Sequence, residues 1–192
     1  MPATSRIQLK TALETLWHVR RDDELVITTM GSAREWMTLG EPHALDFILV
    51  PSAMGHGTSI ALGLALAQPA KRVIVCSGDG SLLMNLGSLA SIVAANVANL
   101  VVIVFDNGVY EVTGQQPTAG ADFCGIARAC GFESVHAFND ATSWSSSARS
   151  ALDAKGPTFV SLNVEPVIGG TAPHSPGPTA LRAKRFMEAL RR

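Results

Sequence analysis

The sequence predicts an α/β fold: a single doubly wound domain in which helices flank a mostly parallel sheet of about six strands. Three observations point to this fold. Short apolar runs rich in β-branched residues recur along the chain, helical patterns separate them, and the central runs are apolar on both faces. The chain has 192 residues, of which 47% are hydrophobic and 16% charged, so it can bury one sizeable core.

Each element follows from its own pattern. Six apolar runs are predicted strands, at residues 24–29, 47–50, 72–77, 100–105, 134–138 and 158–164. Helices are predicted at residues 59–67, 82–95, 122–130 and 142–154, with further helices at about 5–20 and 179–190. The Pro- and Gly-rich segment before the last helix reads as an exposed connection. We expect one domain over residues 1–192, with a motif core at 22–165 and a C-terminal helical tail at about 166–192.

Composition excludes several classes of protein. Fifteen Lys and Arg against sixteen Asp and Glu give a net charge of −1, which predicts no nucleic-acid or anionic-membrane surface. The three cysteines lack CxxC spacing, so neither a disulfide framework nor a metal–thiolate cage is expected. No apolar run approaches the roughly 20 residues of a membrane span, and the first residues lack a signal-peptide core. These features predict a cytoplasmic protein.

Candidate binding residues follow the predicted strands. In an open parallel sheet, ligands bind beyond the carboxyl ends of the strands. After the third predicted strand, Gly78 and Gly80 allow a sharp turn and close approach to a ligand, and Ser81 stands where the next helix begins. Free N–H groups at a helix start favour a phosphate, which Asp79 alone would repel. A hard cation such as Mg²⁺ between the carboxylate and the phosphates removes the conflict.

The end of the next predicted strand supplies further oxygen atoms. Asn107 offers a neutral amide oxygen, and the irregular backbone that follows can turn a carbonyl near Val109 inward. Together with Asp79, these groups predict a metal–diphosphate clamp. Each of the tripeptides GDG and DNG is also a common turn, so the prediction depends on their combination with the intervening helix and strand.

These motifs resemble those of a known family. GDGS, followed by MNL and, after the next strand, by DN, resembles the cofactor motif in the diphosphate-binding domain of thiamine-diphosphate enzymes. PSAMGHGTSIALGLALA resembles the segment leading into that motif, and the likeness covers about residues 22–165. TTMGSAREW, DNGVYEVTG and PGPTALRAKRFMEAL are most similar to sulfopyruvate decarboxylase β subunits and the matching half of phosphonopyruvate decarboxylases.

The resemblance implies roles for individual residues. Asp79, the Asn107 side chain and the Val109 carbonyl are expected to bind Mg²⁺, and Met54 matches the bulky apolar residue that supports the cofactor in a V shape. Tyr110 and Glu111 follow the metal loop and are candidates to line the site, with packing of the next helix as the alternative; of the two, Tyr110 is assigned to the cofactor. The other residues assigned to the cofactor are Thr28, Thr29, Gly31, Ser52, Gly78, Gly80 and Ser81, of which the first three are expected in a loop.

Three departures from the family pattern stand out. Asp106 replaces a common Asn, and Ser52 replaces a common Gly; we expect both changes to be tolerated. Gln115 stands where a second Gly is expected, which leaves the substrate open, and we treat Gln115 and Arg34 as candidate substrate contacts. His56 is a candidate for proton transfer or anion binding. The alternatives are a helix cap for His56 and a solvated surface position for Arg34.

The resemblance also implies that part of the active site lies on a second protein. In the family, a glutamate from a separate pyrimidine-binding domain activates the cofactor, and 192 residues leave no room for that domain. We therefore expect a pyrimidine-domain α subunit as partner, a homodimer of this chain within the heteromer, and a small anionic 2-oxoacid as substrate.

The function predicted from the sequence is the β subunit of a thiamine-diphosphate- and Mg²⁺-dependent 2-oxoacid decarboxylase acting on sulfopyruvate or phosphonopyruvate. Three alternatives stay open at this point. They are an acetolactate-synthase-like carboligase subunit, a 2-oxoacid:ferredoxin oxidoreductase β subunit, against which the lack of clustered cysteines counts, and a non-catalytic diphosphate-binding module.

Overall fold

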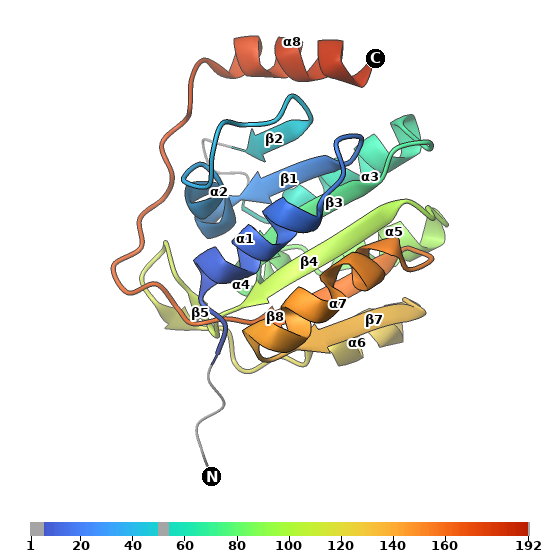
Figure 1. Ribbon diagram of the computed structural model, residues 1–192. Coiled ribbons are helices and arrows are strands. Elements are labelled where there is room, and N and C mark those ends of the chain that lie inside the picture. The colour runs from blue at the N-terminus through green and yellow to red at the C-terminus, as the bar shows by residue number, and fades with distance from the viewer. Residues whose placement is uncertain (1–5, 50–53, 192) are drawn as a thin grey trace.

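The computed structural model describes residues 6–49 and 54–191, and its main feature is a sheet of six parallel strands (Figure 1). The strand order is β2-β1-β3-β4-β8-β7. The strands are β1 (Leu25–Thr29), β2 (Asp46–Leu49), β3 (Val73–Gly78), β4 (Leu100–Asp106), β7 (Ser134–Phe138) and β8 (Thr158–Asn163). Each falls on one of the six predicted runs, so the predicted sheet is confirmed. A small antiparallel ribbon of β5 (Val109–Tyr110) and β6 (Gln116–Pro117) was not predicted.

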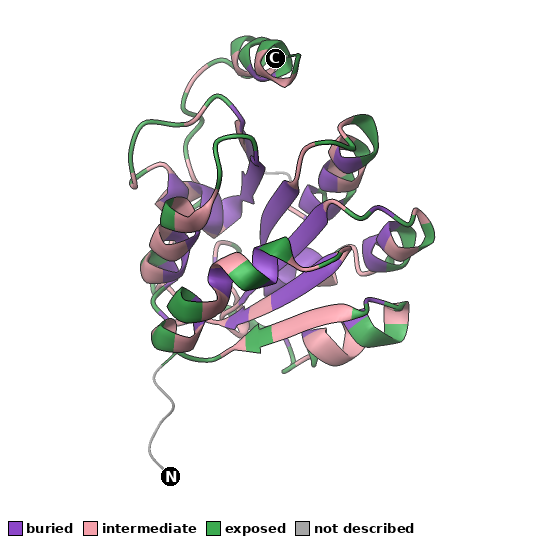
Figure 2. Ribbon diagram, turned by 45° about the vertical axis from the view of Figure 1, so that its right-hand side comes forward, coloured by how far each residue is buried: buried purple, intermediate pink, exposed green. Residues whose placement is uncertain are grey.

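Helices cover both faces of the sheet. They are α1 (Leu9–Val19), α2 (Met30–Trp36), α3 (Gly57–Ala67), α4 (Asp79–Leu83), α5 (Gly87–Ala94), α6 (Phe123–Cys130), α7 (Ala141–Asp153) and α8 (Thr179–Leu190). One apolar cluster joins α1, α2 and α7 to the sheet, and a second joins α3, α5 and α6 to its other face. The strands β1 and β4 are buried over nearly their whole length, as their apolar sequences predict (Figure 2).

Two predictions about the helices were wrong. Residues 30–36 form α2 where we expected a loop, so Gly31 lies in a helix. The helix predicted at 82–95 is two helices, α4 and α5, and α4 already begins at Asp79. The break follows from tertiary contacts, because Asn85 lies in the intervening turn and donates hydrogen bonds to the Gly55 carbonyl, at 2.9 Å, and to Ser59.

The order of the strands indicates where a ligand-binding crevice is expected. The chain passes from β1 to β2 on one side and then crosses to β3 on the other side of β1, so the order reverses between β1 and β3. In open α/β sheets, ligands bind at such a reversal, beyond the carboxyl ends of the strands. The residues that follow β3 and β4 are therefore well placed for a binding site.

The segment after β8 has two parts. Residues 165–171 run close to α2 and the end of β5, where the Val167 N–H donates to Glu111 and the Thr171 carbonyl accepts from Arg34. The predicted exposed connection is confirmed in part, because residues 168, 169 and 171 are exposed while the others are half-buried. Further on, α8 packs beside β2 through Phe186 and Phe47, whose ring centroids are 4.8 Å apart (Figure 1). Among the described residues, no helix is both long enough and apolar enough to span a membrane.

Candidate functional site

A pocket lies at the carboxyl edge of the sheet, between the start of α2, the end of β3 and the β4–β5 loop. Most of the predicted cofactor and metal residues meet there. Those that line it are Gly31, Met54, Gly78, Asp79, Gly80, Ser81, Asn107, Val109 and Tyr110. Segments far apart in the sequence thus converge on one hollow, as the strand-end argument predicts.

The Asp79 carboxylate is the most buried acidic group of this pocket, with 1% of the residue exposed. Its Oδ1 accepts a hydrogen bond from the Gly80 N–H at 2.7 Å. Its Oδ2 accepts from the Gly108 N–H at 2.8 Å and from the Thr118 hydroxyl at 3.2 Å. Asp79 therefore ties the end of β3 to the loop that carries Asn107. Sequence analysis did not single out Thr118, which lies eleven residues beyond the DN motif.

The electrostatics of this edge are unusual because Asp79 and Asp106 interact with each other, whereas the nearby Glu111 is paired with Arg34. The pKa of Asp79 is raised to about 6: burial is the largest cause and the neighbouring Asp106 also raises it, while the Gly80 and Gly108 N–H groups lower it in part. Burial also raises the pKa of Asp106. Neither carboxylate forms an ion pair within the part of the chain that the structure describes. A bound divalent cation would supply the missing positive charge.

Asn107 is held in a tight turn beside Asp79. Its Oδ1 accepts from the Val109 N–H at 2.9 Å, and its Nδ2 donates to Glu111 Oε2 at 3.0 Å. Gly108 between them has φ +81°, a left-handed conformation that favours glycine. A carboxylate, an amide oxygen and main-chain carbonyls are the hard oxygen donors that Mg²⁺ prefers, so the donor set fits this metal. In residues 6–49 and 54–191, no cluster of three or more His, Cys, Asp or Glu could hold a metal instead.

The glycine turn and the Met54 segment are closely packed. A Cβ atom on Gly80 would lie 2.6 Å from the Tyr110 ring, so the ring covers this glycine and leaves no room for a side chain. The Gly55 N–H donates to Ser81 Oγ at 2.9 Å, and Gly55 has φ +81°. This hydrogen bond holds the residue that follows Met54 against the first turn of α4.

Three residues predicted to bind the cofactor or to act in catalysis do not line the pocket, and a fourth cannot be placed. Thr28 and Thr29 are fully buried in β1, and the Thr29 hydroxyl donates to the Cys76 carbonyl at 3.2 Å. His56 is exposed at the start of α3, where its side chain makes no capping hydrogen bond. Ser52 lies outside the described residues. The assignment of these residues to the cofactor or to catalysis stays a prediction.

Arg34 and Gln115 instead contact one residue, Glu111, the first at its side chain and the second at its main chain. Arg34 Nη2 donates to Glu111 Oε1 at 2.9 Å, and its Nε donates to Glu35 at 3.0 Å. Gln115 is exposed, and its Nε2 donates to the Glu111 carbonyl at 2.9 Å. Their contact with a substrate stays a prediction, whereas the pocket-lining Glu111 at their centre is a feature that sequence analysis left undecided.

The fold and the pocket together define an α/β domain with a candidate ligand-binding pocket at the switch point of a parallel sheet. Comparison with known sequences identifies the family. The profile of the thiamine pyrophosphate enzymes, C-terminal TPP binding domain, matches residues 28–162. The chain belongs to this family, and its predicted cofactor is therefore supported as thiamine diphosphate.

Individual relatives allow a more specific comparison within the family. The chain is 42% identical over 158 residues to a phosphonopyruvate decarboxylase of Streptomyces viridochromogenes, covering 81% of this chain but 39% of that protein. It is 36% identical to a sulfopyruvate decarboxylase subunit β of Methanothermobacter thermautotrophicus, covering 76% of each chain. The chain thus spans about two fifths of the first relative and three quarters of the second.

A solved structure shares the fold. The thiamine diphosphate-dependent 4-hydroxybenzoylformate decarboxylase of Rhodococcus jostii RHA1 superposes with a TM-score of 0.72 at 21% identity, covering 84% of this chain and 33% of that one. At this identity the likeness concerns the fold alone.

Proposed function

We propose that the chain is the β subunit of a thiamine-diphosphate- and Mg²⁺-dependent 2-oxoacid decarboxylase of the sulfopyruvate or phosphonopyruvate type. The observation that carries the proposal is the buried Asp79 carboxylate, which is joined to the Asn107 loop and lacks a protein cation, inside a domain of this family. The names and lengths of the relatives support the decarboxylase assignment and the term β subunit.

In this proposal, the chain holds and orients the cofactor. Asp79, the Asn107 amide oxygen and the Val109 carbonyl bind Mg²⁺, and the turn at Gly78, Gly80 and Ser81 receives the diphosphate. The remaining assigned residues, Thr28, Thr29, Gly31, Ser52, Met54 and Tyr110, surround its other parts. When bound, thiamine diphosphate supplies the electron sink for loss of CO₂ from a 2-oxoacid.

The activating glutamate would come from a pyrimidine-domain α subunit. The sulfopyruvate decarboxylase relatives named as β subunits match over most of their length, 76% and 91%, whereas the phosphonopyruvate decarboxylase is matched over 39%. This difference supports a function that is divided between two subunits. We further propose a homodimer of this chain within the heteromer and a cytoplasmic location.

The substrate is proposed to be a small anionic 2-oxoacid. Arg34 and Gln115 are the candidate contacts for its anionic group, and His56 is the candidate for proton transfer. Arg34 already pairs with Glu111, so a substrate anion would have to share or replace that partner.

The proposal can be tested by reconstitution. The chain is purified alone and with the protein that co-purifies with it, and CO₂ release from sulfopyruvate, phosphonopyruvate and pyruvate is measured with thiamine diphosphate and Mg²⁺. We expect the chain alone to bind the cofactor without turnover and the pair to release CO₂. Substantial turnover by the chain alone would contradict the divided site.

A second candidate function is a carboligase. The chain is 26% identical over 162 residues to acetolactate synthase isozyme 1 large subunit of Escherichia coli, covering 75% of this chain and 28% of that protein. Analysis of the products separates the two functions, since a decarboxylase releases an aldehyde and a carboligase forms a joined ketone.

A further inference from the structure

Glu111 occupies the wall of the pocket with only 7% of its side chain exposed. One carboxylate oxygen, Oε2, accepts from Asn107 Nδ2 at 3.0 Å and from the Val167 N–H at 3.0 Å. The other, Oε1, accepts from Arg34 Nη2 at 2.9 Å. A buried carboxylate with three donors is well satisfied, and one of these donors is the side chain of a proposed metal ligand.

The contact with Asn107 decides which end of its amide faces which neighbour. An ionised carboxylate can only accept hydrogen bonds, and a main-chain N–H can only donate. The Asn107 NH₂ group must therefore face Glu111, and its oxygen must face the Val109 N–H. The reverse orientation would oppose oxygen to oxygen and N–H to N–H, which removes both hydrogen bonds.

Glu111 is itself held from three directions. Arg34 comes from α2, Val167 from the segment after β8, and Asn107 from the loop after β4. Packing limits the side chain further, because a Cβ atom on Gly170 would lie 2.7 Å from Glu111 Oε1. The carboxylate can therefore act as a fixed reference for the amide.

We propose that Glu111 is a positioning residue that holds the Asn107 carboxamide with its oxygen, rather than its nitrogen, available to the divalent cation. The inference rests on the proposed Mg²⁺ site and adds a residue that does not itself contact the metal. Without the carboxylate, the amide loses its orienting acceptor and presents nitrogen for part of the time. Loss of such a supporting partner typically weakens metal binding about 10- to 100-fold.

The test measures metal affinity. Mn²⁺, a paramagnetic substitute for Mg²⁺, is titrated into the full chain in the presence of thiamine diphosphate, and free Mn²⁺ is followed by electron paramagnetic resonance. We expect Glu111→Gln to weaken Mn²⁺ binding about tenfold, because the charged Arg34 attracts its single oxygen and its NH₂ group then faces Asn107. Glu35→Gln is the matched control, because Glu35 accepts from the same guanidinium of Arg34 but does not contact Asn107; its affinity should stay within about twofold of wild type.

A reciprocal exchange separates positioning from simple loss of packing. In Asn107→Asp combined with Glu111→Gln, the donor and acceptor change places, so the hydrogen bond between the two side chains can form again. We expect Asn107→Asp alone to bind Mn²⁺ weakly, because the Glu111 carboxylate repels the new carboxylate and displaces it. The double variant should recover part of the lost affinity, since the Val167 N–H then lacks its acceptor. Because the double variant restores the contact, the comparison stands even where Glu111→Gln folds poorly.

The outcomes are distinct. Wild-type affinity in Glu111→Gln, equal weakening in Glu35→Gln, or no recovery in the double variant would each overturn the positioning role while leaving the metal site intact. Failure of the wild-type chain to bind Mn²⁺ with thiamine diphosphate would overturn the metal site and the positioning role together.

Discussion

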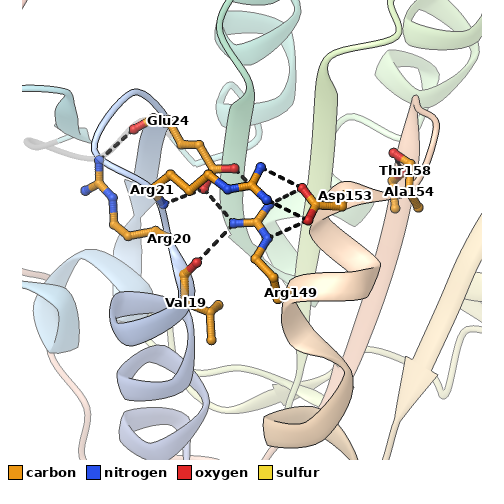
Figure 3. Close-up of polar contacts among 8 residues, drawn as sticks. All are labelled: Val19, Arg20, Arg21, Glu24, Arg149, Asp153, Ala154 and Thr158. Carbon is orange, nitrogen blue, oxygen red and sulfur yellow. Dashed lines mark hydrogen bonds and ion pairs between the residues drawn. The ribbon is translucent and has the colours of Figure 1, made fainter.

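Asp79 at the carboxyl edge of the sheet and the buried acidic groups at its amino edge differ in their partners. At the amino edge, Glu24 precedes β1 and is 2% exposed, and both of its oxygens accept from Arg149, at 3.0 and 2.9 Å (Figure 3). Asp46, at the start of β2, pairs with Arg20. At the carboxyl edge, Asp79 is buried to the same degree but accepts only from neutral donors.

This difference distinguishes buried charged groups that stabilise the fold from those that bind a ligand. A buried ion pair that is complete within the chain contributes to the fold, and removal of one partner leaves the other charge unpaired. A buried carboxylate without a nearby cation reduces stability unless a ligand supplies a positive charge. Such a carboxylate therefore indicates a binding site. Asp79 and Glu24 therefore form a natural pair for mutational tests.

The largest expected effect is on binding at the carboxyl edge. Asp79→Asn removes the charged metal ligand, and we expect the affinity for Mg²⁺ with thiamine diphosphate to fall at least ~100-fold. The free energy of unfolding without metal should change by no more than about 1 kcal/mol, because loss of an unpaired charge offsets a weakened hydrogen bond. Calorimetric titration and urea unfolding measure the two quantities. A large loss of stability in Asp79→Asn would show that Asp79, like Glu24, mainly stabilises the fold.

Glu24→Gln should give the opposite result. We expect it to lower the free energy of unfolding by roughly 2 kcal/mol, at the low end for a broken buried pair because Arg149 is partly exposed. Cofactor affinity of the folded protein should stay unchanged. Urea unfolding measures the loss, with Glu133→Gln at an exposed site as control. If Glu24→Gln were as stable as Glu133→Gln, the ion pair between Glu24 and Arg149 would contribute little to stability.

A pH dependence of the metal-free chain sharpens the comparison. Because burial raises the folded-state pKa of Asp79 to about 6, the folded state binds more protons than the unfolded state between pH ~4 and 6. This group should therefore lower the free energy of unfolding as pH rises through that window, by on the order of 2 kcal/mol. Asp79→Asn should flatten this part of the profile. An unchanged slope in the variant would assign it to other groups.

The smallest effect is expected at the exposed part of the amino edge. Arg21 pairs with Asp153 at 2.9 Å, but 56% of its side chain is exposed (Figure 3). We expect Arg21→Gln to change the free energy of unfolding by less than about 0.5 kcal/mol, since solvent and salt screen such pairs. Thermal unfolding at low and high salt measures it. A loss of stability comparable to that of Glu24→Gln would show that the exposure of these ion pairs does not determine their contributions to stability.

The sequence predicts the sheet well because each strand is specified by its own apolar residues. The convergence of Asp79 and Asn107 also follows from sequence, since parallel strands end at a common edge. The helix α2 was missed because it has only seven residues and lacks the usual capping signature. Its third residue, Ser32, rather than a Glu or Gln, accepts from the Thr29 N–H at 3.1 Å.

The role of Glu111 could not be read from sequence for a different reason. Its partners Arg34 and Val167 lie 77 and 56 positions away, and their approach depends on how α2 and the segment after β8 cross the sheet edge. The charge of Asp106 was likewise expected to matter little, whereas its proximity raises the pKa of Asp79. Both are properties of assembled tertiary structure.

The path of residues 165–171 has a practical consequence for protein engineering. A truncated protein limited to the family match, residues 28–162, would lack the Val167 N–H and the Thr171 carbonyl that anchor Glu111 and Arg34. It would keep every proposed metal ligand yet lose part of the frame around them. Expression boundaries for biochemical work are therefore better placed beyond residue 171.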